Sequence, residues 1–310
     1  MNIEIGGFLD LNLFNKNSYH PNAYKINLAR HGINIILKYH NYQKVYLPKY
    51  ISDTVYKILD IPYEFYEIDE TFMTKLNPNI IRKNEVIIFP NYFGINNKNI
   101  LKALKRFDHI IIDNAHAFYQ KLKGHNVVYS ARKFFGVPDG SYIYTKKKLD
   151  LNLKIDNSHQ KFLPLLKKKE LGSNISYNKY LEVEKNYAHS EPKFMSKTTN
   201  EILNSINYKN DIKLRIENYK YFHENLKFKN RLNLKSLDGN IPMNYPFLFS
   251  KKLKNLLLKY NIYIPTYYSN SKKYFKKNSF ENELLENLIA LPIDGRVNKK
   301  IIKYILEFII

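Results

Sequence analysis

The sequence predicts an α/β protein with a large domain, built on a mostly parallel mixed sheet flanked by helices, and a small C-terminal α/β domain. Strand-like and helix-like segments alternate through the first half, which is typical of a parallel sheet covered by helices. Two later strand-like segments lie too close together for a crossover helix, and a second alternation follows residue 240. The 310 residues suffice for both domains.

The first alternation extends to residue 114, with apolar, β-branched and aromatic runs as strands and longer amphipathic runs as helices. The predicted helices are INIILKYH (33–40), ISDTVYKILD (51–60) and NKNILKALKRF (97–107). The predicted strands are KVYLPKY (44–50), YEFYEI (63–68), EVIIFPN (85–91) and HIIIDN (109–114). NVVYS (126–130) and SYIYT (141–145) then add an antiparallel edge.

The second half carries weaker patterns. Residues 150–190 are polar and are expected to be irregular, whereas 197–228 has helical character with a break near Asn207. The small domain is expected to contain strands IPMNYPFLF (241–249) and NIYIP (261–265), the helix KKLKNLLLKY (251–260) and an amphipathic helix over 297–310. We therefore divide the chain into a large domain over 1–205, a linking helix over about 197–228 and a small domain over 229–310.

The amino-acid composition restricts the partners, metal sites and locations that we expect for this protein. The net charge of +22 runs through every segment together with abundant Asn, Ile and Tyr, a pattern that an AT-rich genome produces, so we expect no nucleic-acid partner. The absence of cysteine excludes disulfides and thiolate metal sites. The start MNIEIGGFLDLNLF lacks the basic segment of a secretory signal, and no apolar run is long enough for a membrane span, so a cytoplasmic location is expected.

Polar residues follow three of the predicted strands. HIII runs into Asp113 and His116, VIIFP into Asn91, and VVY into Ser130 and then Lys133. Ligands of open α/β sheets bind outside the carboxyl ends of the strands. If these strands are parallel neighbours, their polar residues face one pocket.

These residue types suit pyridoxal 5′-phosphate. A lysine in a partly dry site has a lowered pKa and attacks aldehydes, so Lys133 fits a Schiff-base lysine. A carboxylate such as Asp113 keeps a pyridine nitrogen protonated, and His116 can contact the ring hydroxyl or stack on the ring. A phosphate binds backbone N–H groups at a helix start, for which LARHG (28–32) offers Ala29 and Arg30.

Simpler interpretations exist for each residue taken alone. Asp113 can cap a turn, His116 can be a structural hydrogen-bonding group, and Lys133 and Arg30 can be surface cations. The spacing of His109, Asp113 and His116 also permits a metal site, although no second cluster of carboxylates or imidazoles supports one.

The segments IIIDNAHAFY and YSARKFFGVPDGSYIYT resemble the fold type I, pyridoxal-phosphate-dependent sugar aminotransferases of the DegT/StrS group. The likeness spans most of the chain and is specific between Asp113 and Lys133. It implies that Lys133 is the Schiff-base lysine, that Asp113 is the partner of the ring nitrogen, and that His116 occupies the family's Gln/His position. LARHGINIIL, KVYLPKYISDTV and IFPNYFG take the places of three further family segments, with Asn91 at a family histidine.

The sequence departs from the family in its phosphate and stacking segments. Ala29 and Arg30 stand where Gly-Thr or Gly-Ser is usual, so Arg30 would replace a hydroxyl contact with a charge-assisted bond to the phosphate. The family's ring-stacking aromatic falls at Ser52, leaving Tyr50 or Tyr92 as substitutes. Ser130, a further phosphate ligand implied by the resemblance, lies closer to the lysine than in typical members.

The resemblance implies an aminotransferase that moves nitrogen from an amino acid, commonly glutamate, to a nucleotide-linked keto sugar for surface glycan biosynthesis. It also implies a homodimer with active sites at the interface. Related dehydratases carry histidine in place of the lysine, so Lys133 argues against that activity. The altered phosphate and stacking positions leave a non-catalytic scaffold or regulatory protein as the alternative.

Overall fold

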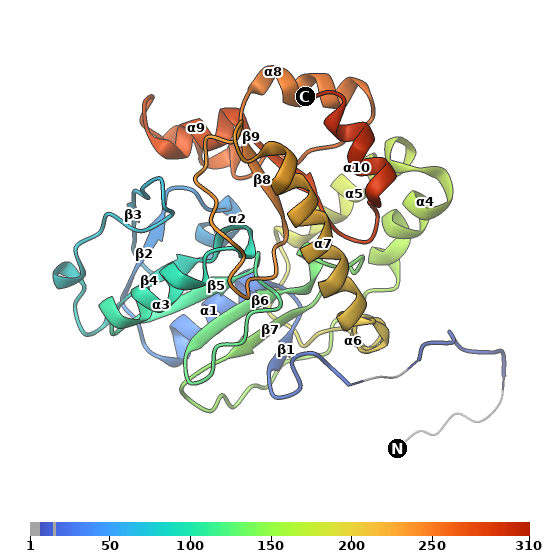
Figure 1. The fold of residues 1–310 in the computed structure, drawn as a ribbon. Helices are drawn as coiled ribbons and strands as arrows, with labels where there is room; N and C mark the ends of the chain where they lie inside the picture. The colour runs from blue at the N-terminus through green and yellow to red at the C-terminus, as the bar shows by residue number, and fades with distance from the viewer. Residues whose placement is uncertain (1–6, 15–16) are drawn as a thin grey trace.

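The computed structural model describes residues 7–14 and 17–310. A seven-stranded sheet forms the centre of the molecule, in the order β1-β7-β6-β5-β4-β2-β3. Its strands are β1 (Tyr24–Ile26), β2 (Lys44–Pro48), β3 (Tyr63–Tyr66), β4 (Glu85–Pro90), β5 (Ile110–Asn114), β6 (Asn126–Ser130) and β7 (Ser141–Tyr144). Strands β2 to β6 are parallel, and β7 runs antiparallel to both β6 and β1. The predicted mixed sheet and its antiparallel edge are therefore confirmed (Figure 1).

Helices cover both faces of this sheet. Helix α1 (Ala29–Tyr39) packs an apolar face against the side chains of Ile111, Val128 and Ile143. Gly32 permits this approach, because a Cβ at this position would lie 3.0 Å from Ile143. Helix α2 (Asp53–Tyr56), shorter than predicted, joins the same layer, and α3 (Asn97–Arg106) packs on the opposite face.

The segment predicted to be irregular forms a pair of helices, α4 (Leu163–Leu171) and α5 (Ser173–Tyr187), joined at Gly172. That prediction was wrong because both helices are largely exposed and carry no continuous apolar stripe to mark them. The predicted break near Asn207 is confirmed. It separates α6 (Lys197–Ser205) from α7 (Tyr208–Leu226), and the Asn207 side chain caps α7.

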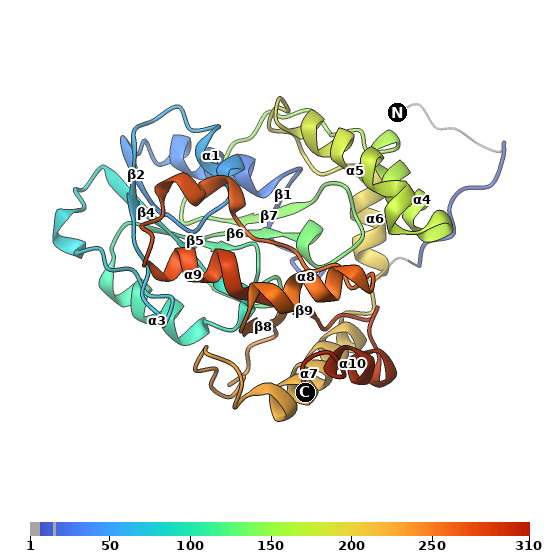
Figure 2. The same cartoon turned by 90° about the horizontal axis from the view of Figure 1, so that it is seen from above.

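The C-terminal elements gather on one side of the molecule (Figures 1 and 2). They comprise β8 (Asn244–Leu248), α8 (Lys251–Lys259), α9 (Phe280–Asn287), β9 (Leu288–Pro292) and α10 (Lys299–Leu306). The strand predicted over 261–265 was wrong, because β8 pairs antiparallel with the more buried β9. Helix α7 shares the core of this unit, whereas α9 packs into the core of the large sheet.

The proposed domain boundaries remain a prediction.

No helix in the described part of the chain has both the length and the apolar character needed to cross a membrane. Five short 3-10 turns complete the fold: η1 (Pro78–Ile80), η2 (Tyr92–Gly94), η3 (Ala131–Lys133), η4 (Gln160–Phe162) and η5 (Ser269–Tyr274).

The turn after β4 joins the sheet to the C-terminal unit. The backbone carbonyl of Phe93 accepts a hydrogen bond of 2.8 Å from Met243 N–H, just before β8. Gly94 has a φ of +70°, and a Cβ there would lie 2.6 Å from the His116 carbonyl oxygen and 2.9 Å from that of Ile241. Only glycine allows three backbone segments to meet this closely.

Substitution of this glycine tests the junction. Gly94→Ala should lower the free energy of unfolding by about 2–4 kcal/mol, because strained φ and a backbone clash add together. Urea denaturation measures the change. Gly136→Ala is the matched control, since a Cβ there meets nothing within 4 Å. Equal stability of the two variants would contradict this role for Gly94.

Candidate active site

The sheet brings the predicted polar residues to one edge. Strands β4, β5 and β6 are adjacent and parallel, with Pro90 opposite Asp113 and Asn114 opposite Tyr129. Their carboxyl ends therefore coincide, as expected for a ligand site in an open α/β sheet. Lys133 lies in η3, directly after β6, so its side chain begins beside the end of β5.

Asp113 is partly exposed to solvent, but protein atoms surround most of its carboxylate. Its Oδ1 accepts a hydrogen bond of 2.9 Å from the Ala115 backbone N–H. Burial raises its pKa to about 6, although the Ala115 N–H and the charge of Lys133 act in the opposite direction. Asp113 is therefore an anion at neutral pH that lacks full hydration.

Lys133 keeps an exposed side chain in the same poorly hydrated region. Burial lowers its pKa, and the neighbouring Arg132 adds to that effect, whereas Glu184 and Asp113 raise it. The side chain is therefore accessible to solvent while protein atoms surround much of it, and we call the region beside Lys133, Asp113 and His116 the hollow. Lys133 and Asp113 influence the pKa of each other, and they follow adjacent parallel strands at the same edge of the sheet.

His116 forms the buried floor beside this pair. Burial, together with the charge of Lys133, holds its pKa well below the ordinary value, so the ring is neutral. Its Nε2 lies 3.4 Å from the hydroxyl of Tyr268, and the two ring planes are only 8° apart. The carbonyl of His116 is the group that the Gly94 turn approaches.

Two arginines lie near the start of α1. The guanidinium of Arg30 donates to the Tyr187 carbonyl, and Arg132 pairs with Glu184. Burial and the charge of Arg132 lower the pKa of Arg30. Within the described part of the chain, the Nε atoms of both arginines are buried without a hydrogen-bond partner. Two crowded guanidinium groups with unused donors beside a helix N-terminus suit a phosphate.

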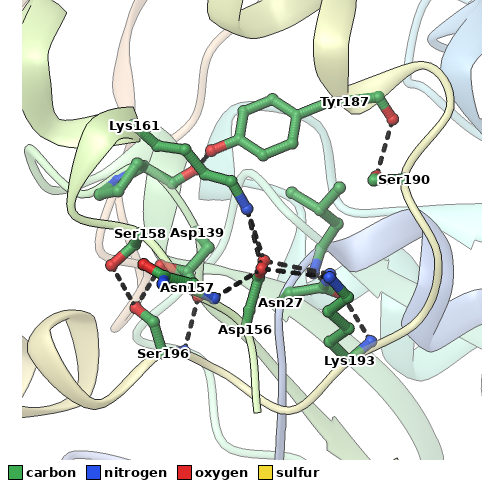
Figure 3. Close-up of polar contacts among 12 residues, drawn as sticks. Asn27, Asp139, Asp156, Asn157, Ser158, Lys161, Tyr187, Ser190, Lys193 and Ser196 are labelled. Carbon is green, nitrogen blue, oxygen red and sulfur yellow. Dashed lines mark hydrogen bonds and ion pairs between the residues drawn. The ribbon is translucent and has the colours of Figure 1, made fainter. Parts of the chain in front are cut away.

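A polar network fixes the loops around this edge (Figure 3). The carbonyl of Asn27, just before α1, accepts a hydrogen bond of 2.6 Å from Gly140 N–H, and the Asn27 side-chain amide donates to the Glu191 carbonyl. Asp139 is fully buried and accepts hydrogen bonds from Ser196 Oγ and backbone N–H, both at 2.8 Å. The turn that follows Lys133 is thereby tied to α1 and α6.

Two predicted ligands, Asn91 and Tyr50, are buried and contact protein in this structure, and their roles stay predictions. Asn91 is completely buried, and its amide nitrogen donates to Asn97 and Gln120, both at 3.0 Å, while its oxygen accepts from Asn96 N–H. These bonds hold the turn after β4 and leave its amide occupied by protein. Tyr50 is also completely buried, so its ring offers no face to a ligand.

The remaining predicted residues stay predictions. Ser52 is partly exposed at the start of α2, where its hydroxyl lies 2.9 Å from that of Thr54. Ser130 is the buried last residue of β6, and Ala29 is the partly exposed first residue of α1.

Sequence reasoning missed Arg132 and Tyr268. Arg132 directly precedes Lys133 in the sequence, so its position next to the predicted Schiff-base lysine could have identified it. Tyr268 reaches the site from the C-terminal unit, and no local pattern marks it.

The two clearest cavities lie elsewhere. One of about 340 Å³ lies among α8, η5 and α9, and one of about 390 Å³ lies beside Lys25 and Phe194. Neither cavity is lined by Asp113 or Lys133. The described residues contain no cluster of three potential metal ligands, so the alternative site at His109, Asp113 and His116 gains no support.

A scan against protein-family models finds no match, and a search of curated proteins finds no relative. Solved structures do match. They include a DegT DnrJ EryC1 StrS aminotransferase from Brucella abortus (13% identity, 93% of this chain and 84% of that one, TM-score 0.59). The aminotransferase TlmJ from Streptoalloteichus hindustanus also matches (12%, 93% and 84%, 0.62).

A third match is the sugar aminotransferase CalS13 from Micromonospora echinospora (12% identity, 94% of this chain and 87% of that one, TM-score 0.60). The chain has the fold type I aminotransferase fold. The fold class predicted from the sequence is therefore confirmed across nearly the whole length of these proteins.

The raised pKa of Asp113 predicts how stability varies with pH. The carboxyl has a pKa of 3.8 when unfolded and about 6 when folded, so its contribution is fully present below pH 3.8 and is lost as pH rises through 6. The free energy of unfolding of Asp113→Asn, relative to that of the native protein, should therefore rise by about 2 kcal/mol as the pH increases from about 4 to about 7.

Urea denaturation across this pH range measures the difference. Asp60→Asn, at an exposed position, is the control. A difference for Asp113→Asn that stays constant with pH would show that this carboxylate is not desolvated.

Proposed function

We propose that this protein is a pyridoxal-phosphate-dependent aminotransferase that transfers nitrogen from an amino acid such as glutamate to a nucleotide-linked keto sugar. The observation that carries the proposal is the placement of Lys133 and Asp113 after adjacent parallel strands of a fold type I sheet, where the charge of each influences the pKa of the other. We further propose a cytoplasmic homodimer acting in surface glycan biosynthesis.

The side chains fit the three polar parts of the cofactor. Asp113 suits the ring nitrogen, because a partly desolvated carboxylate is stabilised by a protonated pyridine. Lys133 suits the aldehyde, since its lowered pKa leaves more of the amine neutral and nucleophilic. The unused donors of Arg30 and Arg132 suit the phosphate.

Bound pyridoxal phosphate supplies an electron sink for the carbon that carries the amino group. Asp113 would hold the proton on the ring nitrogen. The amine of Lys133, once free, would carry a proton between the carbon that bears the amino group and a carbon of the cofactor. The buried frame of Asn27 and Asp139 would keep that amine in place during both half-reactions.

The matching structures support this chemistry and this substrate class. A Streptococcus pneumoniae protein assigned as a sugar aminotransferase matches in both its PLP form and its PMP form. DesI matches in a structure determined in the presence of its TDP-sugar product. The charge of +22 would attract the diphosphate of such a substrate.

The alternative is a scaffold or regulatory protein without transaminase activity. The serine at the family's stacking position favours it, and neither of the two cavities is lined by Asp113 or Lys133. Purified protein that stays colourless with added cofactor would support the scaffold and contradict the enzyme.

Lys133→Ala tests covalent attachment. Borohydride treatment with pyridoxal phosphate should label native protein on the peptide that contains residue 133, and the variant should lose this label. Peptide mass spectrometry reads the outcome. Lys25→Ala is the matched control, because burial also lowers the pKa of Lys25, which should not be the attachment site. A label that persists in Lys133→Ala would overturn the assignment.

Asp113→Asn tests the electron sink. Native protein loaded with cofactor should release a stoichiometric burst of 2-oxoglutarate from glutamate without any sugar. The variant should slow this burst on the order of a hundredfold or more, because a neutral ring withdraws electrons poorly. Rapid-quench measurement of 2-oxoglutarate gives the rate. A burst of native speed in the variant would remove Asp113 from this role.

A further inference from the structure

The hollow beside Asp113 requires a flat apolar wall if it is to hold an aromatic ring. The residues that the sequence offers for this wall do not provide it. Ser52 has no ring, and both Tyr50 and Tyr92 are buried, with the hydroxyl of Tyr92 donating to the Tyr50 carbonyl at 2.7 Å. The wall must therefore come from another part of the chain.

Tyr268 is an aromatic residue that lies against this hollow and keeps part of its surface exposed. Its ring packs edge-on against Tyr50 at 4.7 Å between centroids, and its hydroxyl reaches His116 Nε2 at 3.4 Å. After burial, the charge of Asp113 is the largest influence that raises its pKa. Tyr268 therefore bounds the same space as Asp113 and His116.

The adjacent tyrosine is directed differently. The hydroxyl of Tyr267 accepts a hydrogen bond of 2.9 Å from the Asn244 side chain, at the start of β8. Burial raises the pKa of Tyr267 and Asn244 lowers it, and Asp113 is not among the named causes. Both rings lie against His116, with 5.1 Å between centroids for Tyr267 and 6.1 Å for Tyr268, but only the Tyr268 hydroxyl contacts the imidazole, whereas that of Tyr267 is bound to Asn244.

Tyr268 is held in place at a conformational cost. It has a left-handed backbone, with φ of 60° and ψ of 31°, a conformation that is unfavourable for a tyrosine. Contacts on the C-terminal side offset this strain. Ser271 Oγ donates to the Ile51 carbonyl at 2.7 Å, and Tyr274 packs on Phe65 with 4.4 Å between centroids. Strained backbone that is fixed in this way is typical of ligand sites.

We propose that Tyr268 supplies the aromatic wall of the cofactor site, replacing from the C-terminal unit the ring that the segment after β2 lacks. This inference rests on the proposed function. It assigns the polar ends of the cofactor to the sheet and its flat face to a residue more than a hundred positions away in the sequence. The C-terminal unit thereby becomes part of the cofactor site.

Pyridoxamine 5′-phosphate provides the test, because its amine cannot condense with Lys133 and its binding reports non-covalent contacts alone. Its dissociation constant can be measured by calorimetry on ligand-free protein. Tyr268→Ala should weaken binding about tenfold, as expected for the loss of one aromatic contact. Tyr268→Phe should bind within about threefold of native protein, since the ring face remains.

Tyr274→Ala is the matched control, because it removes a tyrosine of the same segment that packs on Phe65. Circular dichroism melts establish that each variant is folded. Native affinity in Tyr268→Ala would overturn the inference and leave the proposed function standing. Equal losses in Tyr268→Ala and Tyr274→Ala would also overturn it, since the segment would then act only through its fold. Native protein that fails to bind would overturn the proposed function, and this inference with it.

Discussion

The opposite charges of Asp113 and Lys133, held in poorly hydrated surroundings at neighbouring strand ends, are the constraint on which the site depends. Burial raises the pKa of Asp113 and lowers that of Lys133, so it favours the neutral form of each group. The attraction between their charges opposes both shifts. The pair persists because the parallel register of β5 and β6 fixes the backbone on both sides. The network of Asn27 and Asp139 then fixes the turn beyond Lys133.

The same edge gathers backbone segments that approach unusually closely. Gly94 lies against the carbonyl of His116, and Gly32 lies against Ile143 beneath the start of α1. A side chain at Gly94 would push apart the turn after β4, the turn after β5 and the chain that enters β8. The floor of the site and its attachment to the C-terminal unit therefore depend on one position without a side chain.

The sequence predicted the strand positions of the candidate site residues, because local patterns determine them. Asp113 and Lys133 follow apolar strands that pair in parallel, so the register of one sheet brings both positions to the same edge, and their roles stay predictions. Asn91 satisfied the same pattern but is occupied by amide partners from the following turn, which no periodicity reveals. The exposed helices α4 and α5 lack an apolar stripe, and Tyr268 depends on packing between segments that are remote in the sequence. Such contacts are set by tertiary structure, and local patterns do not encode them.

The candidate site contains three features that the surrounding protein satisfies only in part, and one molecule could interact with all of them. Asp113 is a desolvated anion, Lys133 is an amine whose charge is disfavoured, and Arg30 with Arg132 brings two guanidinium groups together with unused donors. A molecule with a protonated ring nitrogen, an aldehyde and a phosphate would stabilise the carboxylate, react with the amine and accept hydrogen bonds from the free Nε donors of the two arginines. Each feature alone would suit a different ligand. Their occurrence in one region therefore supports pyridoxal phosphate more strongly than any single residue does.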